Sequence, residues 1–188
     1  MKILVFDNYD SFTYNLLHYL EMITDAKIEV HRNDKISLEE IERFDKILLS
    51  PGPGLPSEAG ILSELIKTYA STKSIFGVCL GQQAIAEAFG GSLINLEKVY
   101  HGVSTPMKII ADDSLFKNIP VKFNAGRYHS WVVNKNDLPI ELKITCIDES
   151  GNIMALRHKK YDVCSVQFHP ESILTEYGIK IIKNWVSG

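Results

Sequence analysis

The side chains best suited to chemistry are one cysteine and, far along the chain, a histidine followed by a glutamate. Cys79 lies in the run Gly77-Val78-Cys79-Leu80-Gly81, which has the pattern G-x-C-x-G. Glycines on both sides of a nucleophile let the chain turn sharply from a strand into a helix and expose the side chain. His169 and Glu171 stand in the run Phe168-His169-Pro170-Glu171. A nucleophile, a base and a carboxylate that orients the base are together what cysteine-based acyl transfer requires.

Cysteine is more often a buried packing residue than a nucleophile, so the setting of Cys79 decides its role. A position between a strand and a following helix puts the thiol at the positive end of the helix dipole, which favours the thiolate. The amide of Leu80 would point to where an oxyanion forms. We therefore predict that Cys79 is a nucleophile. Cys146 and Cys164 lie in apolar strand patterns, and we predict that both only pack in the core.

His169 differs from an ordinary surface histidine because it follows an apolar strand pattern and precedes a proline. Pro170 fixes the backbone and blocks further strand pairing. Glu171 can accept a hydrogen bond from one ring nitrogen of His169, which leaves the other nitrogen to face Cys79. A histidine, proline and glutamate in succession also occur for purely structural reasons. We predict that His169 is a base and Glu171 its orienting group only because the same chain also has the Cys79 run.

A third feature is the loop Ser50-Pro51-Gly52-Pro53-Gly54-Leu55-Pro56. It is a rigid turn after a strand, and its glycines also allow the backbone to approach a ligand closely. We predict that the amide of Gly52 is a second oxyanion donor. Two further segments are open to two interpretations each. Residues 7–15 cap a helix or help to form the site, and residues 127–131 pack in the core or line a pocket for a small polar substrate.

The first half of the chain alternates strand and helix patterns. Strands are expected at residues 3–6, 27–31, 46–49 and 74–78. Helices are expected at 11–23, with Asp10 or Ser11 as the N-cap, then after the capping box Ser37-Leu38-Glu39-Glu40, and at 61–70 and 82–89. This alternation indicates right-handed βαβ units and a parallel sheet, and the short apolar strands fit a sheet covered on both faces.

The second half is mostly strand-like. Strands are expected at residues 103–111, 121–125, 142–148, 153–158 and 162–168, with a hairpin turn at 150–152 and a last helix at 178–186. We interpret these strands as antiparallel ones that extend or flank the parallel sheet. The predicted fold class is therefore α/β: a single domain over residues 1–188, with a central, mostly parallel sheet, helices on both faces and an antiparallel β extension.

Composition excludes several kinds of function. The chain has 188 residues, 45% of them hydrophobic, and a formal net charge of −3, with no cluster of Lys and Arg among aromatic residues. We therefore expect no nucleic-acid partner. No apolar run reaches the roughly 18 residues of a membrane helix, and the apolar start is too short for a signal peptide. The odd number of cysteines favours a reducing, cytoplasmic location, and no residue spacing indicates a metal site.

Five segments together resemble the class I, triad-type glutamine amidotransferases, and within them the branch that serves chorismate-using synthases. These segments are residues 7–15, 50–60, 77–83, 127–130 and 168–175, which span nearly the whole chain. The resemblance implies a flavodoxin-like fold, no cofactor, L-glutamine as substrate and, as partner, a large chorismate-binding synthase subunit. It favours anthranilate formation for tryptophan, with aminodeoxychorismate formation for folate, or both, as the alternative.

The resemblance also implies a role for each site residue. Cys79 is the expected nucleophile, and His169 and Glu171 complete the triad. The expected glutamine-binding residues are Gly52, Pro53, Gly54 and Leu80, largely through the backbone, and Gln83, Ser130 and Trp131 at the amino-acid end of the substrate. Two positions depart from the family pattern, since Trp131 stands where leucine is frequent and Gln82 where histidine is frequent. The Trp131 side chain matters little if its backbone makes the contact.

Two other classes of function fit part of the pattern. A cysteine hydrolase of the γ-glutamyl hydrolase type shares the G-x-C-x-G turn but is usually secreted, and the chain shows no signal peptide. A binding subunit without catalytic activity is expected to lack Cys79, His169 or Glu171, and all three are present.

Overall fold

A computed structural model describes residues 1–188. It contains a main sheet of nine strands and a separate pair of strands. The main sheet consists of β1 (Lys2–Asp7), β2 (Lys27–Arg32), β3 (Lys46–Leu49), β4 (Ser74–Val78), β6 (Val103–Ile109), β7 (Lys122–Arg127), β9 (Leu142–Asp148), β10 (Ile153–His158) and β11 (Val163–Val166). The separate pair is β5 (Leu93–Asn95) and β8 (Trp131–Val133). The α-helices are α1 (Thr13–Ile23), α2 (Leu38–Ile41), α3 (Leu62–Tyr69), α4 (Leu80–Ala88) and α5 (Gly178–Ser187).

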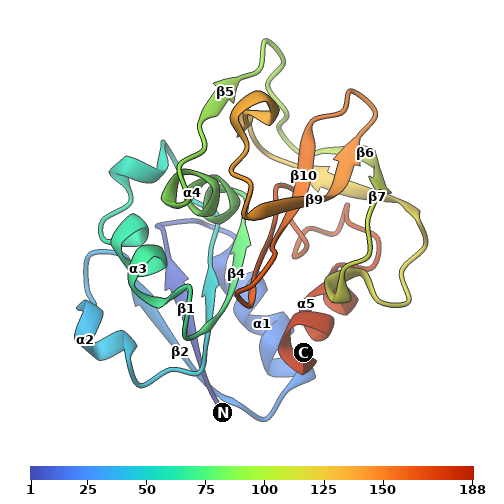
Figure 1. Ribbon diagram of the computed structural model, residues 1–188. Coiled ribbons are helices and arrows are strands. Elements are labelled where there is room, and N and C mark those ends of the chain that lie inside the picture. Colours follow the sequence, from blue (N-terminus) through green and yellow to red (C-terminus); the bar gives the residue numbers. More distant parts are fainter.

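The main sheet has a parallel half and an antiparallel half. Its strand order is β2-β1-β3-β4-β11-β10-β9-β6-β7. The strands from β2 to β11 pair in parallel, and those from β10 to β7 continue the sheet in antiparallel pairs (Figure 1). This arrangement confirms the predicted fold class.

The direction of β11 corrects one expectation. The sequence placed this strand in the antiparallel extension, whereas it pairs in parallel with β4, from Val163 opposite Ile75 to Val166 opposite Val78. All four of its residues are buried, which suits a central strand between β4 and β10. Because parallel strands end at the same edge of a sheet, the residues that follow β4 and β11 come together there.

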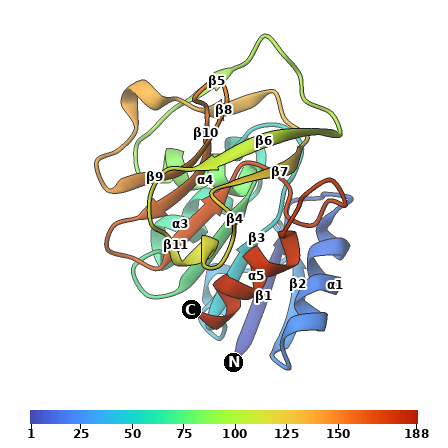
Figure 2. The same cartoon turned by 90° about the vertical axis from the view of Figure 1, so that its right-hand side faces the viewer.

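Helices cover both faces of the parallel half. On one face, α1 and α5 contribute Leu16, Leu20, Ile181 and Ile182 to one buried cluster. On the other face, α3 and α4 contribute Leu65, Ile66 and Ile85 to a second cluster. Figure 2 shows α1 and α5 side by side on this face. Helix α1 lies against β1 and β2, and the Trp185 ring of α5 packs on Phe76 of β4. The apolar strands are therefore shielded from water on both sides, as their composition predicted.

Some element ends differ from the sequence expectation. Helix α1 begins at Thr13, and Phe12 is its N-cap with no side-chain hydrogen bond, so the predicted Asp10 or Ser11 cap is wrong. Asp10 instead accepts a hydrogen bond from the Phe12 amide (2.8 Å) in the turn before the helix. The capping box of α2 and the β9–β10 hairpin are confirmed. The strands β5 and β8 were not predicted, because three-residue strands are too short to show a periodic pattern.

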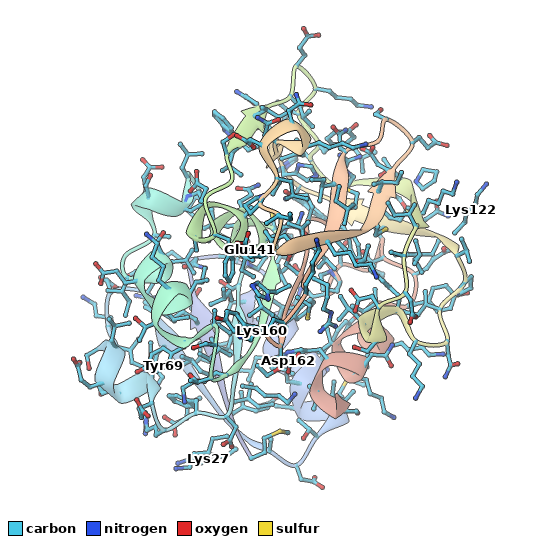
Figure 3. All side chains as sticks on the ribbon, viewed as in Figure 1. Lys27, Tyr69, Lys122, Glu141, Lys160 and Asp162 are labelled. Carbon is cyan, nitrogen blue, oxygen red and sulfur yellow. The ribbon has the colours of Figure 1, made fainter.

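Most charged side chains lie on the outside of the molecule, as those of Lys27 and Lys122 do in Figure 3. Both chain termini lie at the lower end of Figure 1, where β1 begins, and so at the opposite end of the parallel strands from the residues that follow β4. No helix combines the length and the apolar character that crossing a bilayer requires.

Candidate active site

Cys79 occupies a strained turn between β4 and α4. It is the N-cap of α4, with φ 52° and ψ −100°, and its amide donates to the Val166 carbonyl of β11 (2.8 Å). A non-glycine residue in such a conformation costs about 1–3 kcal/mol and persists only where the surroundings enforce it. The predicted strand-to-helix turn is therefore confirmed, and Cys79 lies at the positive end of the helix dipole.

Glycines on both sides of Cys79 allow β4 and α4 to approach each other. A Cβ atom on Gly77 would lie 2.6 Å from the carbonyl carbon of Gly81, and one on Gly81 would lie 2.9 Å from the Leu49 backbone. Both distances are shorter than real carbon contacts allow. The G-x-C-x-G pattern thus follows from close packing of this strand, this helix and β3.

His169 and Glu171 form a buried pair at the carboxyl end of β11. Nδ1 of His169 lies 2.6 Å from Oε1 of Glu171, and both side chains are almost fully buried. Because the carboxylate accepts, Nδ1 carries the proton and donates. The rings of Phe12 and Tyr128 pack against the imidazole at centroid distances of 5.5 and 4.8 Å and hold its plane.

The surroundings of His169 favour its protonated form. Burial by itself lowers the pKa of His169, but the neighbouring Cys79 thiol and Glu171 carboxylate outweigh burial and raise the pKa well above its ordinary value. Its Nε2 atom has no close hydrogen-bond partner. Hydrogen bonds between catalytic groups are frequently long in a free enzyme and tighten when substrate binds. Nε2 is therefore free to exchange a proton with a reacting group beside Cys79.

A cavity of about 370 Å³ opens in front of Cys79. Seven of the predicted site residues line it, namely Gly52, Pro53, Gly54, Cys79, Gln83, Ser130 and Trp131. His169, Glu171 and Leu80 are not part of its wall. Tyr128 and His129 do line it, so residues 127–131 contribute to a pocket as well as to packing. Leu55, Val99, Tyr100 and His101 complete the wall and were not predicted.

The loop after β3 is held in place by the segment that follows β1. The Asn8 amide donates to Ser50 Oγ and its side chain donates to the Ser50 carbonyl, both at 2.9 Å. A Cβ atom on Gly52 would lie 2.6 Å from that of Asn8, and Gly54 has φ 71°. Capping a helix is therefore not the only role of residues 7–15, since they also fix the glycine loop beside Cys79.

A buried ion pair supports the wall at residues 127–131. Nη1 of Arg127 donates to Asp148 at 2.8 Å, and the guanidinium lies 3.6 Å from the ring centre of Tyr100. Nε of Arg127 donates to Nε2 of His129 (3.1 Å), so Nδ1 of His129 carries the proton and donates to the Trp131 carbonyl (3.0 Å). Burial, and next the Arg127 charge, lower the pKa of His129 to about 3. His129 is thus neutral and acts as a structural link.

Sequence reasoning missed Gln167, which contacts the thiol. Its Nε2 donates to Sγ of Cys79 at 3.4 Å, and its side chain is fully buried. A buried glutamine at the end of an apolar strand must find hydrogen-bond partners, and this could have drawn attention to it. Cys146 and Cys164 are buried, and burial raises the pKa of each to about 12, which agrees with packing roles.

Comparison with known proteins identifies the family. The family model for glutamine amidotransferase class-I matches residues 4–187. Anthranilate synthase component 2 of Cyanophora paradoxa is 46% identical, over 98% of this chain and 98% of that protein. Aminodeoxychorismate/anthranilate synthase component 2 of Bacillus subtilis is 42% identical, over 98% of this chain and 95% of that protein. The chain spans only 32% of a 45% identical bifunctional protein, TrpGD, of Thermotoga maritima.

A solved structure agrees with these matches. A putative GMP synthase subunit protein of Thermoplasma acidophilum superposes with a TM-score of 0.89 at 25% identity, covering 100% of this chain and 92% of that one. The fold, the cysteine turn and the sequence matches lead to one conclusion. This chain belongs to the class-I glutamine amidotransferase family.

Proposed function

We propose that this chain is a glutaminase subunit that hydrolyses L-glutamine through Cys79, His169 and Glu171 and supplies ammonia to a chorismate-binding synthase subunit. The observation that carries the proposal is the strained Cys79 at the start of α4, which faces a cavity and lies beside the buried His169–Glu171 pair. Membership of the amidotransferase family supports the reaction class.

The geometry supports a thioester mechanism. The Cys79 thiolate attacks the side-chain carbonyl carbon of glutamine, and the amides of Gly52 and Leu80 stabilise the oxyanion. Protonated His169 gives its proton to the departing nitrogen, so ammonia leaves and a glutamyl thioester remains. Neutral His169 then takes a proton from water, which attacks the thioester and releases glutamate as the thiolate re-forms.

Electrostatics support the starting state of this mechanism. The raised pKa of His169 favours an imidazolium at neutral pH, and the dipole of α4 favours a thiolate at its first turn. Glu171 stabilises the imidazolium through Nδ1 and fixes the ring so that Nε2 is the atom that exchanges protons. The mechanism therefore starts with the proton on His169, from which it passes to the leaving nitrogen.

The cavity residues hold the rest of the substrate. Gly52, Pro53 and Gly54 of the cavity wall, and Leu80 next to Cys79, present backbone groups to the reacting amide, while Gln83, Ser130 and Trp131 bind the amino-acid end. The supporting observation is that the Trp131 carbonyl already accepts from Gln83 Nε2 at 3.0 Å, so this wall offers ordered polar groups. The side chain of Trp131 is half-buried, and the proposed role uses its backbone.

The synthase partner uses chorismate, and the more favoured product is anthranilate. The names of the relatives from Cyanophora paradoxa and Bacillus subtilis support this, and the second name also includes aminodeoxychorismate. Free ammonia would become protonated in water, so direct transfer between subunits preserves its reactivity. We place this assembly in the cytoplasm, and the three free cysteines of the chain support a reducing compartment.

The test is to purify the chain from its native cells and identify the large subunit that copurifies. The complex is then given glutamine and chorismate, and the products are separated by chromatography. Anthranilate is the expected product. Aminodeoxychorismate alone would replace the anthranilate assignment but keep the ammonia-supplying role. Hydrolysis of γ-glutamyl peptides without any chorismate-dependent product would instead identify a γ-glutamyl hydrolase and overturn the proposal.

A further inference from the structure

A chain of hydrogen bonds leads from the cavity wall to the sulfur of Cys79. Gln83 Nε2 donates to the Trp131 carbonyl (3.0 Å) and to Oε1 of Gln167 (3.3 Å). Nε2 of Gln167 in turn donates to Sγ of Cys79 (3.4 Å). The last link joins two residues that follow neighbouring parallel strands, since Cys79 comes directly after β4 and Gln167 directly after β11.

The orientation of the Gln167 amide is determined by its neighbours. A backbone carbonyl can only accept, so the atom of Gln83 beside Trp131 must be its nitrogen. The same nitrogen faces Gln167, which must therefore present its oxygen to Gln83 and its NH₂ group to Cys79. Because His129 also donates to the Trp131 carbonyl, that acceptor is itself held in place.

The buried amide of Gln167 interacts more strongly with the thiolate of Cys79 than with its neutral thiol. A neutral S–H is a weak acceptor, whereas a hydrogen bond to a charged group is roughly twice as strong as a neutral one. Gln167 is fully buried, so water does not compete for its amide, and low local polarity strengthens the contact. The Gln167 amide therefore stabilises the thiolate more than the thiol.

We propose that Gln167 is a further catalytic residue, whose side-chain amide holds the reacting sulfur of Cys79 and stabilises its thiolate, while Gln83 positions that amide. That Gln167 acts in glutamine hydrolysis rests on the proposed function. That its amide stabilises the Cys79 thiolate does not. Other charged or titratable groups also lie near the thiol: His169 is adjacent, Glu171 and Asp10 act on His169, and His129 and His101 line the cavity. The dipole of α4 adds to them. A test must therefore change Gln167 alone.

The test is the pH dependence of alkylation of the intact chain by iodoacetamide. Cys79 should react selectively because the pKa of Cys146 and of Cys164 is raised to about 12 and both are buried. Loss of labelling in Cys79→Ala verifies the site. In Gln167→Met, which removes the donor at similar volume, the midpoint of Cys79 alkylation should move up by about one to two pH units.

Gln82→Met is the matched control. Gln82 is as fully buried as Gln167, but its side chain donates to the Ile153 carbonyl (3.3 Å) and accepts from Ser165 (3.1 Å), away from the thiol. Its variant should leave the alkylation midpoint of Cys79 unchanged. Equal midpoints in wild type and Gln167→Met, or equal shifts in both methionine variants, would overturn the proposal.

The wild-type chain gives a second measurement if Gln167→Met does not fold. In the ¹⁵N NMR spectrum, one glutamine side-chain amide should shift with the same midpoint as Cys79 alkylation, and this shift should be absent in Cys79→Ala. No amide signal with that midpoint would overturn the inference. A glutaminase assay tests the proposed function separately from the role of Gln167. Full glutaminase activity in Cys79→Ala would contradict the proposed function, whatever the alkylation and NMR midpoints are.

Discussion

At the scale of single residues, the proposed mechanism gives the triad members different roles. In it, Cys79 forms and breaks a bond to the substrate and His169 moves protons through Nε2, while Glu171, 2.6 Å from Nδ1, holds the imidazole. The residue missed by sequence analysis, Gln167, reaches Cys79 through a contact between segments far apart in the chain. Local patterns detect a turn or a motif, but they do not show which buried side chains meet across neighbouring strands.

Removing the base should harm catalysis more than removing its orienting group. We expect His169→Ala to lower kcat for glutamine hydrolysis by about 10–100-fold more than Glu171→Ala does, because Glu171 exchanges no proton with the substrate. The measurement is steady-state glutamate release by both variants, with circular dichroism to verify folding. A folded Glu171→Ala variant that is slower than His169→Ala would contradict these roles.

His129 should make the fold sensitive to acid. Its folded-state pKa is lowered to about 3, chiefly by burial and then by Arg127, against an ordinary value of about 6.5 in the unfolded chain. As pH falls below about 6.5, the unfolded chain binds a proton at His129 that the folded chain does not bind. The contribution of neutral His129 to the free energy of unfolding is therefore fully present above about pH 6.5 and is lost progressively towards about pH 3.

The acid effect is measured by urea unfolding of wild type and His129→Gln at several pH values. Glutamine keeps a donor and an acceptor but does not titrate in this range. Between pH 6 and 4, the free energy of unfolding of wild type should fall faster than that of the variant, by up to about 1.4 kcal/mol per pH unit. Parallel curves for the two proteins would show that His129 protonates in the folded state.

At the scale of elements, the site depends on where β4 and β11 end. The apolar, evenly spaced strands and the glycines around Cys79 were predictable, because they follow from local packing and turn geometry. The parallel direction of β11 was not, since a short buried strand reads the same in either direction. Yet this direction brings His169 to the edge of the sheet where Cys79 lies. An antiparallel β11 would have placed His169 at the opposite edge, away from Cys79.

The approach of α4 to β4 should tolerate no side chain at Gly77. In Gly77→Ala the new Cβ would lie 2.6 Å from the Gly81 backbone, so the helix must move away. We expect a loss of about 1–3 kcal/mol of stability, as in overpacked cores, and a fall in kcat because Cys79 and Leu80 move with the helix. Chemical denaturation and glutaminase assays measure the two effects.

Gly151→Ala is the control for this change. Gly151 lies in the β9–β10 hairpin with φ 79° and has no atom within 4 Å of a new Cβ. Its substitution strains the turn and lowers stability but should leave kcat unchanged. If Gly77→Ala also kept full kcat, the tight β4–α4 packing would not be what positions the nucleophile.

At the scale of the whole molecule, segments from both halves of the chain line the cavity. The parallel half supplies the loop at Gly52 and the turn at Cys79, and the segments around the antiparallel half supply Tyr100, Ser130 and Trp131. Both termini lie at the other end of the parallel strands (Figure 1), so a tag at either end stays away from the site. Partner and product are properties of the assembly and are not fixed by this cavity.

The central claim is that Cys79 releases ammonia from glutamine for a synthase partner, and one experiment tests it most directly. In the complex with the large subunit, Cys79→Ala should lower glutamine-dependent product formation to below about a thousandth of wild type. Synthesis from added ammonium salt should continue at the wild-type rate, because the partner's chemistry needs only the amine. Cys146→Ala, at a buried cysteine outside the site, should keep both activities. Substantial glutamine-dependent synthesis by Cys79→Ala would contradict the account.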